Sequence, residues 1–133
     1  MEHLTFHHIG MATDSIEHSS KLYIEAGFRA SETILDPVRK VRICFLTRQN
    51  HPDIELIEPA GQDAPVCNYL KKNGVGPYHL CYRTTSMDGA VRRLKGKHFI
   101  LLGKPAPACA IHNRPVCFMY HRNIGLIELV EEP

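Results

Sequence analysis

The chain repeats itself, and this repeat constrains the fold more than any other feature of the sequence. Three blocks of the first half recur in the second half in the same order, at offsets of 71 to 73 residues. The paired blocks are residues 8–13 with 79–84, residues 43–45 with 116–118, and residues 54–59 with 127–133. One such match arises easily by chance, whereas three in register predict two copies of one structural unit. We expect a single domain made of a first repeat over about residues 4–60, a linker helix over about 64–75 and a second repeat over about 77–133.

Both copies show the same order of expected elements, β-α-β-β-β. Alternating and continuous apolar runs predict the strands, and Ser, Thr and Asp before apolar periodic segments predict the helix starts. In the first copy we expect strands at residues 6–12, 28–35, 41–47 and 54–58, with a helix that starts within 14–17 and ends at Gly27. In the second copy we expect strands at 78–83, 98–102, 114–120 and 126–131. The second helix starts at residues 85–88, which resemble a capping box with Asp88 as the returning acid. A short helix over 66–72 joins the copies, and the fold class is α+β.

Composition excludes several classes of protein. The net charge of +2 gives no electrostatic footprint for nucleic acid or an anionic membrane. No apolar run reaches the length of a bilayer span, and the N-terminus lacks the pattern of a secretory signal. The five cysteines are odd in number and contain no CxxC pair, which indicates reduced thiols in a cytoplasmic protein.

The repeat selects two of the nine histidines and gives each of them a glutamate. His8 and Glu55 are 47 residues apart, and His79 and Glu128 occupy the matching positions 49 residues apart. Each glutamate interrupts an apolar strand, where an unpaired carboxylate is costly, so a cation is the partner we expect. Two imidazoles and two carboxylates suit one divalent ion such as Ni, Co, Zn, Mn or Fe. The alternative is that both histidines are core residues bonded to backbone and that both glutamates face solvent.

At these positions the sequence resembles the vicinal oxygen chelate superfamily, also called the glyoxalase/bleomycin resistance/dioxygenase superfamily. The motifs that carry the resemblance are residues 8–10, 54–59, 64–66, 76–80 and 125–131, so it spans nearly the whole chain. The resemblance is to methylmalonyl-CoA epimerase and glyoxalase I-like members. It implies two β-α-β-β-β repeats whose curved mixed sheets form a metal-binding cleft.

The ligand count separates the branches of this superfamily. A full set of His8, Glu55, His79 and Glu128 resembles the isomerase and epimerase branch. This branch moves a proton at a carbon next to a metal-bound carbonyl or enolate oxygen. By resemblance, Glu128 is both ligand and catalytic base, with Glu55 as the second carboxylate, in a lactoylglutathione lyase-like or methylmalonyl-CoA epimerase-like reaction. We therefore expect a small carbonyl or thioester substrate, CoA- or glutathione-linked, and a homodimer. The alternatives are a non-catalytic binding or resistance protein of the same fold and a metal-dependent oxygenase.

One departure concerns the second base. Methylmalonyl-CoA epimerases carry a second glutamate a few residues before the strand at 41–45, and here that position falls on Val38 or Pro37. Neither side chain carries a proton, so Asp36 is a weaker catalytic candidate. Either Asp36 substitutes for the glutamate, or the chain is not a methylmalonyl-CoA epimerase.

Four further residues are candidates for substrate binding. Cys81 lies two residues after His79 and so on its face of the strand, although a small buried core residue is the plainer interpretation. The loop over 106–114 borders the substrate in similar proteins, and His112, Asn113 and Arg114 are polar groups that suit a carboxylate, phosphate or thioester. The alternative for these three is an ordinary polar turn.

Overall fold

The computed structural model describes residues 3–133 and divides them into two compact units. The N-terminal unit is His8–Tyr78, and the C-terminal unit joins residues 3–7 to His79–Pro133. Among the described residues, no helix has the length and apolar character that a membrane span requires.

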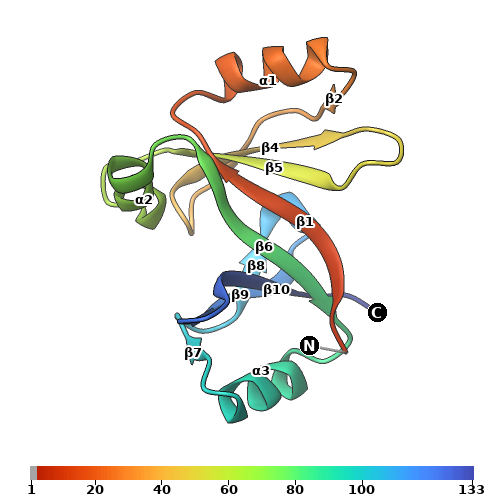
Figure 1. Cartoon of the computed structure of the whole chain (residues 1–133), viewed down its shortest axis with the longest axis vertical. Coiled ribbons are helices and arrows are strands. Elements are labelled where there is room, and N and C mark those ends of the chain that lie inside the picture. Colours follow the sequence, from red (N-terminus) through yellow and green to blue (C-terminus); the bar gives the residue numbers. More distant parts are fainter. Residues whose placement is uncertain (1–2) are drawn as a thin grey trace. The chain divides into compact units, whose positions relative to one another are not determined.

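The N-terminal unit is a five-stranded sheet covered by a helix. Its strands lie in the order β2-β4-β5-β1, with the short β3 also paired to β4. Helix α1 packs against β2, β4 and β5, as Figure 1 shows. The elements are β1 (Thr5–Ala12, which begins in the other unit), α1 (Ile16–Glu25), β2 (Arg29–Ala30), β3 (Ile34–Asp36), β4 (Val41–Thr47), β5 (Asp53–Pro59) and α2 (Pro65–Asn73).

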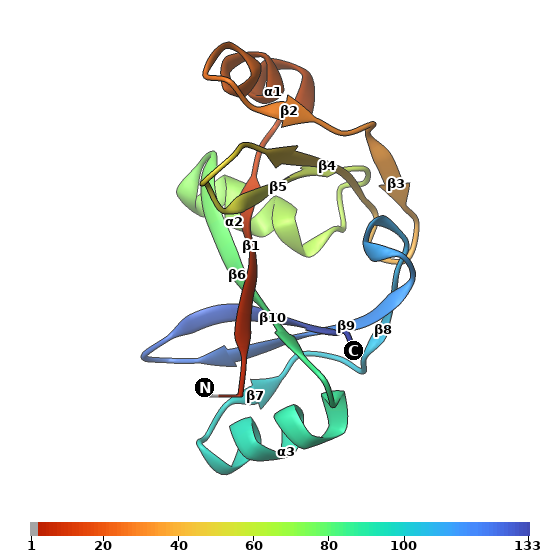
Figure 2. The same cartoon turned by 90° about the vertical axis from the view of Figure 1, so that its right-hand side faces the viewer.

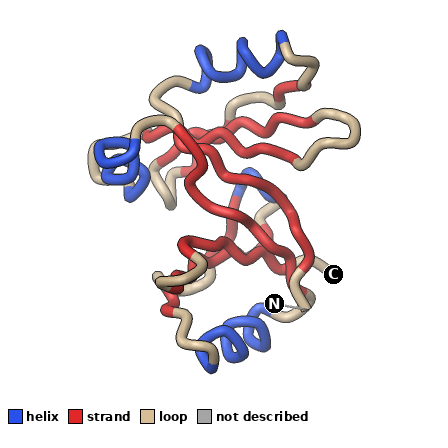
Figure 3. Tube along the Cα trace, viewed as in Figure 1, coloured by secondary structure: helices blue, strands red, loops and turns tan. Residues whose placement is uncertain are grey.

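The C-terminal unit has the same pairing scheme. Its order is β7-β9-β10-β6, with β8 also paired to β9, and α3 packs against β7 and β10 (Figure 2). The elements are β6 (Gly76–Thr84), α3 (Met87–Gly96), β7 (Ile100–Leu101), β8 (Ala106–Ala108), the 3₁₀ turn η1 (Cys109–Ile111), β9 (Arg114–His121) and β10 (Gly125–Glu131). In both units the first and last long strands are parallel neighbours, β1 with β5 and β6 with β10. The expected α+β class is therefore confirmed, and red strands dominate Figure 3.

Two of the expected strands are wrong in their extent. The strand expected over 28–35 is broken into β2 and β3. Arg29 lies opposite Thr47 and Ile34 lies opposite Ile43. The chain therefore advances five residues from β2 to β3 while the partner strand β4 advances only four. The extra residue lies beside Ser31, whose hydroxyl accepts a hydrogen bond from the Phe45 N–H at 2.8 Å. This is the behaviour of a bulge, which patterning alone does not reveal.

The strand expected over 98–102 is also shorter, and its following loop is more ordered than expected. Only Ile100–Leu101 pair with β9, and the expected loop over 106–114 contains β8 and η1. Pro107 lies in β8, which is an outer strand of the sheet, where a missing N–H is tolerated.

A serine side chain caps the start of each of the helices α1 and α3. Ser15 caps α1 by accepting a hydrogen bond from the His18 N–H at 3.1 Å. In α3 the cap is Ser86, which accepts from the Gly89 N–H at 3.1 Å, so the capping box expected from residue 85 with Asp88 is wrong by one residue.

The acid that reaches each helix start comes from a strand. Glu58 of β5 accepts from the Ile16 N–H at 2.9 Å, and Glu131 of β10 accepts from the Met87 N–H at 2.7 Å. Each carboxylate therefore satisfies one of the N–H groups that a helix leaves without an intrahelical partner.

Each sheet has one face toward its helix and one face away from it, which we call the distal face. The helix-side core of the C-terminal unit includes Leu94, Met119 and Leu129, and that of the N-terminal unit includes Ile16, Leu46 and Leu56. Because side chains alternate along a strand, Glu55 and Glu128, each next to a core leucine, point to the distal faces.

Candidate metal centre

The N-terminal unit places His8 and Glu55 together on its distal face. His8 is on β1 and Glu55 on the adjacent parallel strand β5, where Gly10 is the register partner of Glu55. The Nε2 atom of His8 lies 3.4 Å from Oε1 of Glu55, and the side chains are 0% and 4% exposed. The structure thus brings together the first pair that the repeat selected.

The C-terminal unit repeats this arrangement with His79 and Glu128. His79 is on β6 and Glu128 on the parallel strand β10, where Cys81 is the register partner of Glu128. The Nε2 atom of His79 lies 3.2 Å from Oε1 of Glu128, and the side chains are 1% and 5% exposed. The two units therefore carry the same buried donor pair at matching positions.

A phenylalanine stands beside each pair, and the sequence reasoning did not single it out. Phe45 of β4 lies opposite Glu55, and its ring meets His8 edge-on with centroids 5.4 Å apart. Phe118 of β9 lies opposite Glu128, and its ring meets His79 edge-on at 5.2 Å. Both belong to the repeated block at 43–45 and 116–118, so their matching positions in the repeat could have identified them as site residues. The aromatic edges limit the orientations available to each imidazole.

The donor chemistry of each pair fits a divalent ion. A carboxylate buried in an apolar sheet is costly unless a cation or hydrogen bonds compensate it. Imidazole nitrogen and carboxylate oxygen are ligands of first-row divalent metals, and their combination favours such ions over soft thiolate-bound ones. In the simpler alternative there is no metal, and each carboxylate would pair with a protonated imidazole. The desolvation cost of a buried ion pair would then arise in both units.

The charge of Glu128 also acts on a neighbouring thiol. Burial raises the pKa of Cys117 to about 11, and the negative charge of Glu128 adds to the rise. Cys117 points toward the helix side, where its Sγ lies 3.5 Å from the Met87 sulfur. This thiol is therefore a neutral core residue at physiological pH.

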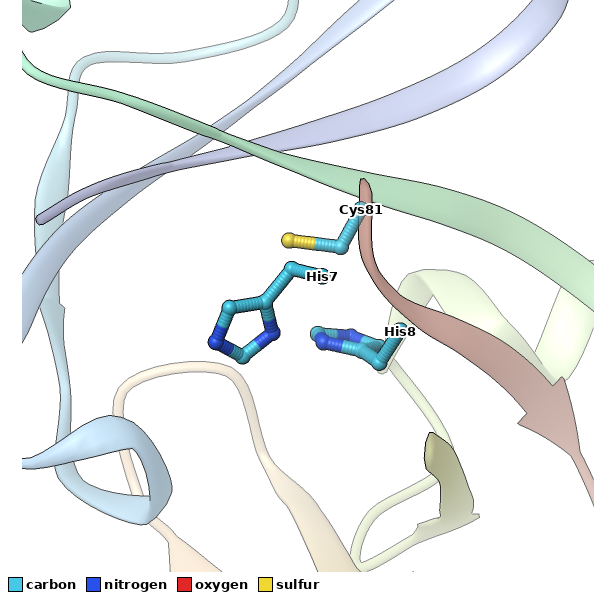
Figure 4. A group of neighbouring side chains, drawn as sticks. All are labelled: His7, His8 and Cys81. Carbon is cyan, nitrogen blue, oxygen red and sulfur yellow. The ribbon is translucent and has the colours of Figure 1, made fainter. Parts of the chain in front are cut away.

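His7 and Cys81 are two further potential metal ligands of the C-terminal unit. Both belong to the C-terminal unit, and a ring nitrogen of His7 lies within 4.8 Å of the Cys81 sulfur. Figure 4 draws these two side chains together with that of His8, the residue after His7 on β1. Cys81 is fully buried, and Nε2 of His7 lies 3.5 Å from Oε2 of Glu132. The His7 ring thus contacts Glu132 within this unit.

The three loop candidates for substrate binding take up different positions. His112 and Asn113 are exposed and both have positive φ, 53° and 58°, so they form the turn between η1 and β9. The Asn113 N–H donates to the Ala108 carbonyl at 2.9 Å. Arg114 begins β9, and its Nε lies 3.5 Å from Oε2 of Glu132.

Asp36 is buried, but its carboxylate is engaged in a turn. Its Oδ1 accepts from the backbone N–H groups of Val38 at 3.0 Å and Arg39 at 3.1 Å. Its Oδ2 accepts from Arg39 Nη1 at 3.0 Å. These three contacts fix the turn between β3 and β4, which is an architectural role.

Comparison with known proteins identifies the superfamily to which the chain belongs. Residues 7–118 match the Glyoxalase/Bleomycin resistance protein/Dioxygenase superfamily. The chain belongs to this superfamily, and the resemblance found in the sequence is confirmed.

Several relatives at about 30% identity are named as epimerases. The chain is 32% identical over 126 residues to the mitochondrial methylmalonyl-CoA epimerase of Mus musculus, covering 92% of this chain and 70% of the mouse protein. It is 29% identical to an ethylmalonyl-CoA/methylmalonyl-CoA epimerase of Cereibacter sphaeroides, covering 92% and 93%. A solved variant of Streptomyces coelicolor methylmalonyl-CoA epimerase, in complex with 2-nitronate-propionyl-CoA, superposes with a TM-score of 0.83 at 25% identity, covering 98% of this chain and 99% of that one. The chain is accordingly an enzyme with the vicinal oxygen chelate fold.

Proposed function

We propose that this chain is a divalent-metal-dependent epimerase that acts at the carbon next to a CoA thioester. The observation that carries the proposal is the buried His–Glu pair in each unit, His8 with Glu55 and His79 with Glu128. We propose that the two pairs together hold one divalent ion. When bound, the ion supplies Lewis acidity that stabilises an enolate oxygen.

The chain's own carboxylates move the proton in this proposal. Glu128 removes the proton from the carbon next to the thioester carbonyl, and Glu55 is the second carboxylate that exchanges a proton with the substrate. Each is held by its own histidine partner on the distal face of its own unit, which limits its rotamers and preorganises the transfer. Asp36 is left out of this scheme because three contacts hold its carboxylate in the turn.

The substrate class follows from the relatives. The mouse and Cereibacter relatives are named for methylmalonyl-CoA and ethylmalonyl-CoA, and the Streptomyces structure contains a CoA-linked analogue. We therefore propose a 2-substituted malonyl-CoA as the substrate and a CoA thioester as its defining feature. His112, Asn113 and Arg114 remain proposed contacts for its polar groups, with Cys81 beside the reacting end.

The deciding experiment combines metal content with proton exchange. We expect the purified chain to bind one equivalent of Ni²⁺, Co²⁺, Zn²⁺, Mn²⁺ or Fe²⁺, and the loaded protein to exchange the C2 proton of methylmalonyl-CoA with deuterated solvent. Failure to bind any of these ions at stoichiometric level would overturn the metal proposal. Metal binding without exchange on methylmalonyl-CoA or ethylmalonyl-CoA, but with turnover of a hemithioacetal or uptake of oxygen, would replace the epimerase by a lyase or an oxygenase.

We further propose a cytoplasmic homodimer. The shortest strands at the sheet edges, β2 and β7, leave backbone groups and apolar side chains such as Ile100, 60% exposed, available for a second copy. Light scattering after gel filtration would give the mass, and a monomer at micromolar concentration would contradict this proposal.

A further inference from the structure

Three basic side chains of the C-terminal unit converge on one carboxylate. Nε2 of His7 and Nε of Arg114 each lie 3.5 Å from Oε2 of Glu132. Nε of Arg83 lies 3.7 Å from Oε1 of the same residue. We call His7, Arg83, Arg114 and Glu132 the Glu132 cluster. Even with His7 neutral, the two arginines outweigh the single carboxylate and leave one net positive charge.

The contacts within the Glu132 cluster are loose. Charge-assisted hydrogen bonds are about 2.7–2.9 Å long, and elsewhere in this chain Arg39 reaches Asp36 at 3.0 Å. The distances of 3.5–3.7 Å around Glu132 are those of shared attraction rather than of a closed bidentate pair.

The arginines also keep donors to spare. A guanidinium has five N–H groups, and the contacts above use Nε of each arginine. Arg83 directs one further N–H, from Nη2, to the Phe6 carbonyl at 3.4 Å. The side chains of Arg83 and Arg114 are 47% and 34% exposed, so an anion from solution can reach them. The cluster therefore has positive charge, donors and access that Glu132 does not use up.

The backbone of the cluster is fixed independently of the Glu132 side chain. The Glu132 N–H donates to the Thr84 carbonyl at 2.9 Å, which continues the pairing of β10 with β6. The carboxylate of Glu132 can therefore swing away, or be replaced by an amide, while Arg83 keeps its place on β6.

The cluster is separate from the His79–Glu128 pair although both lie on the distal face. Glu132 lies four positions after Glu128, which is about 13 Å along a strand. Val130, between them on the same face, and its register partner Val116 on β9 are both 0% exposed. An anion at Glu132 therefore contacts neither His79 nor Glu128.

We propose that Arg83, Arg114 and His7 form an oxyanion site for a carboxylate or phosphate group, and that the Glu132 carboxylate is its internal, competing occupant. Guanidinium groups match the planar oxygens of carboxylate and the oxygens of phosphate. The site does not rest on the proposed epimerase reaction, although Arg114 is also a proposed substrate contact there, and it holds whichever of these anions displaces Glu132.

The test uses the full-length protein, with inorganic phosphate and acetate as the two probes at low ionic strength. The ¹H–¹⁵N signals of the arginine Nε–H groups report directly on the site, because Arg83 and Arg114 carry the reporting atoms. Saturable shifts of these two signals are expected, and the stronger of the two probes identifies the preferred anion. Added NaCl should weaken the binding.

The variants should change the affinity for the anion in opposite directions. An ion-pair cluster with a purely structural role would not show this. Glu132→Gln removes the competing charge and should strengthen anion binding by about two- to fivefold, the scale of an exposed ion pair. Arg114→Gln and Arg83→Gln should each weaken it by a similar factor, and Arg122→Gln, an exposed arginine in the β9–β10 turn, should leave it unchanged. Circular dichroism verifies that each variant is folded. Nε–H signals that do not respond to either anion, or a Glu132→Gln variant that binds no more tightly than the parent, would overturn the proposal.

Discussion

Nε2 of His79 lies 3.2 Å from Oε1 of Glu128, and neither side chain is more than 5% exposed. The same relationship holds between His8 and Glu55 at 3.4 Å. Each unit thus supplies one nitrogen and one carboxylate donor from adjacent parallel strands.

The first prediction concerns the charge of Glu128. Glu128→Gln keeps the shape of the side chain and removes a charged ligand, so we expect the affinity for Co²⁺ or Ni²⁺ to fall by more than about 100-fold, since loss of even an outer-shell partner costs 10–100-fold. Isothermal titration measures the affinity. Glu17→Gln, whose parent side chain is 75% exposed on α1, is the matched control. Equal affinities in the two variants would remove Glu128 from the proposed ligand set.

The second prediction separates turn stability from proton transfer at Asp36. Asp36→Ala removes the acceptor of two backbone N–H groups and an ion pair, and we expect it to lower the free energy of unfolding by about 1–3 kcal/mol. Asp36→Asn keeps an oxygen acceptor and should recover part of this loss in a urea titration. Because the carboxylate is assigned to the turn, the Asn variant should retain proton exchange on the substrate. A folded Asn variant that has lost exchange would make Asp36 a proton carrier after all.

The third prediction concerns thiol reactivity. Burial and the charge of Glu128 raise the pKa of Cys117 to about 11, so its thiolate is scarce at pH 8. Cys109 is exposed, and we expect it to react with a maleimide far sooner than Cys117. Peptide mapping by mass spectrometry distinguishes them, and Cys117 modification that keeps pace with Cys109 in the folded protein would contradict the prediction.

The fourth prediction is the effect of the same thiol on stability at high pH. The pKa of Cys117 is higher in the folded chain than its ordinary value of 9.0, so the folded state holds this proton more tightly than the unfolded state. Its contribution to stability is complete below pH 9 and is lost as the pH rises from 9 toward 11. Cys117→Ala should therefore show a shallower fall in unfolding midpoint over that range than the parent chain. Identical slopes would argue against the raised pKa.

The fifth prediction tests the helix-side core. Leu129 is fully buried between β10 and α3, and Leu129→Ala should cost about 3–5 kcal/mol. Leu22→Ala, on the exposed side of α1 with the leucine 68% exposed, should cost little. Chemical denaturation measures both, and similar losses in the two variants would contradict the packing described above.

Much of the fold was predictable because the repeat carried it. The repeated blocks predicted the order of the elements. In or beside these blocks lie the long strands β4, β5, β9 and β10 and the donors His8, Glu55, His79 and Glu128. The short outer strands were not predictable, because β2 and β3 are separated by a bulge at Ser31 whose hydrogen bond comes from Phe45, a contact distant in sequence. The capping role of Glu131 was hidden for the same reason, since its partner Met87 is 44 residues away.

The site residues differed in how far the sequence determined them. Histidine and glutamate on apolar strands stand out from their neighbours, whereas Phe45 and Phe118 look like any core aromatic until their rings are seen against the imidazoles. The Glu132 cluster draws His7, Arg83 and Arg114 from three separate strands, and no local pattern marks it.

The spacing of the two glutamates on the last strand of each unit restricts where residues can be inserted or deleted in this sequence. Glu55 and Glu58, like Glu128 and Glu131, are three residues apart, an odd number that sends one to the donor pair and the other to the helix start. Inserting or deleting one residue between them would put both carboxylates on the same side of the sheet, so one of the two would lose its partner. Length variation among descendants of this sequence should therefore accumulate in connections such as residues 48–52 and 122–124, and not within β5 or β10.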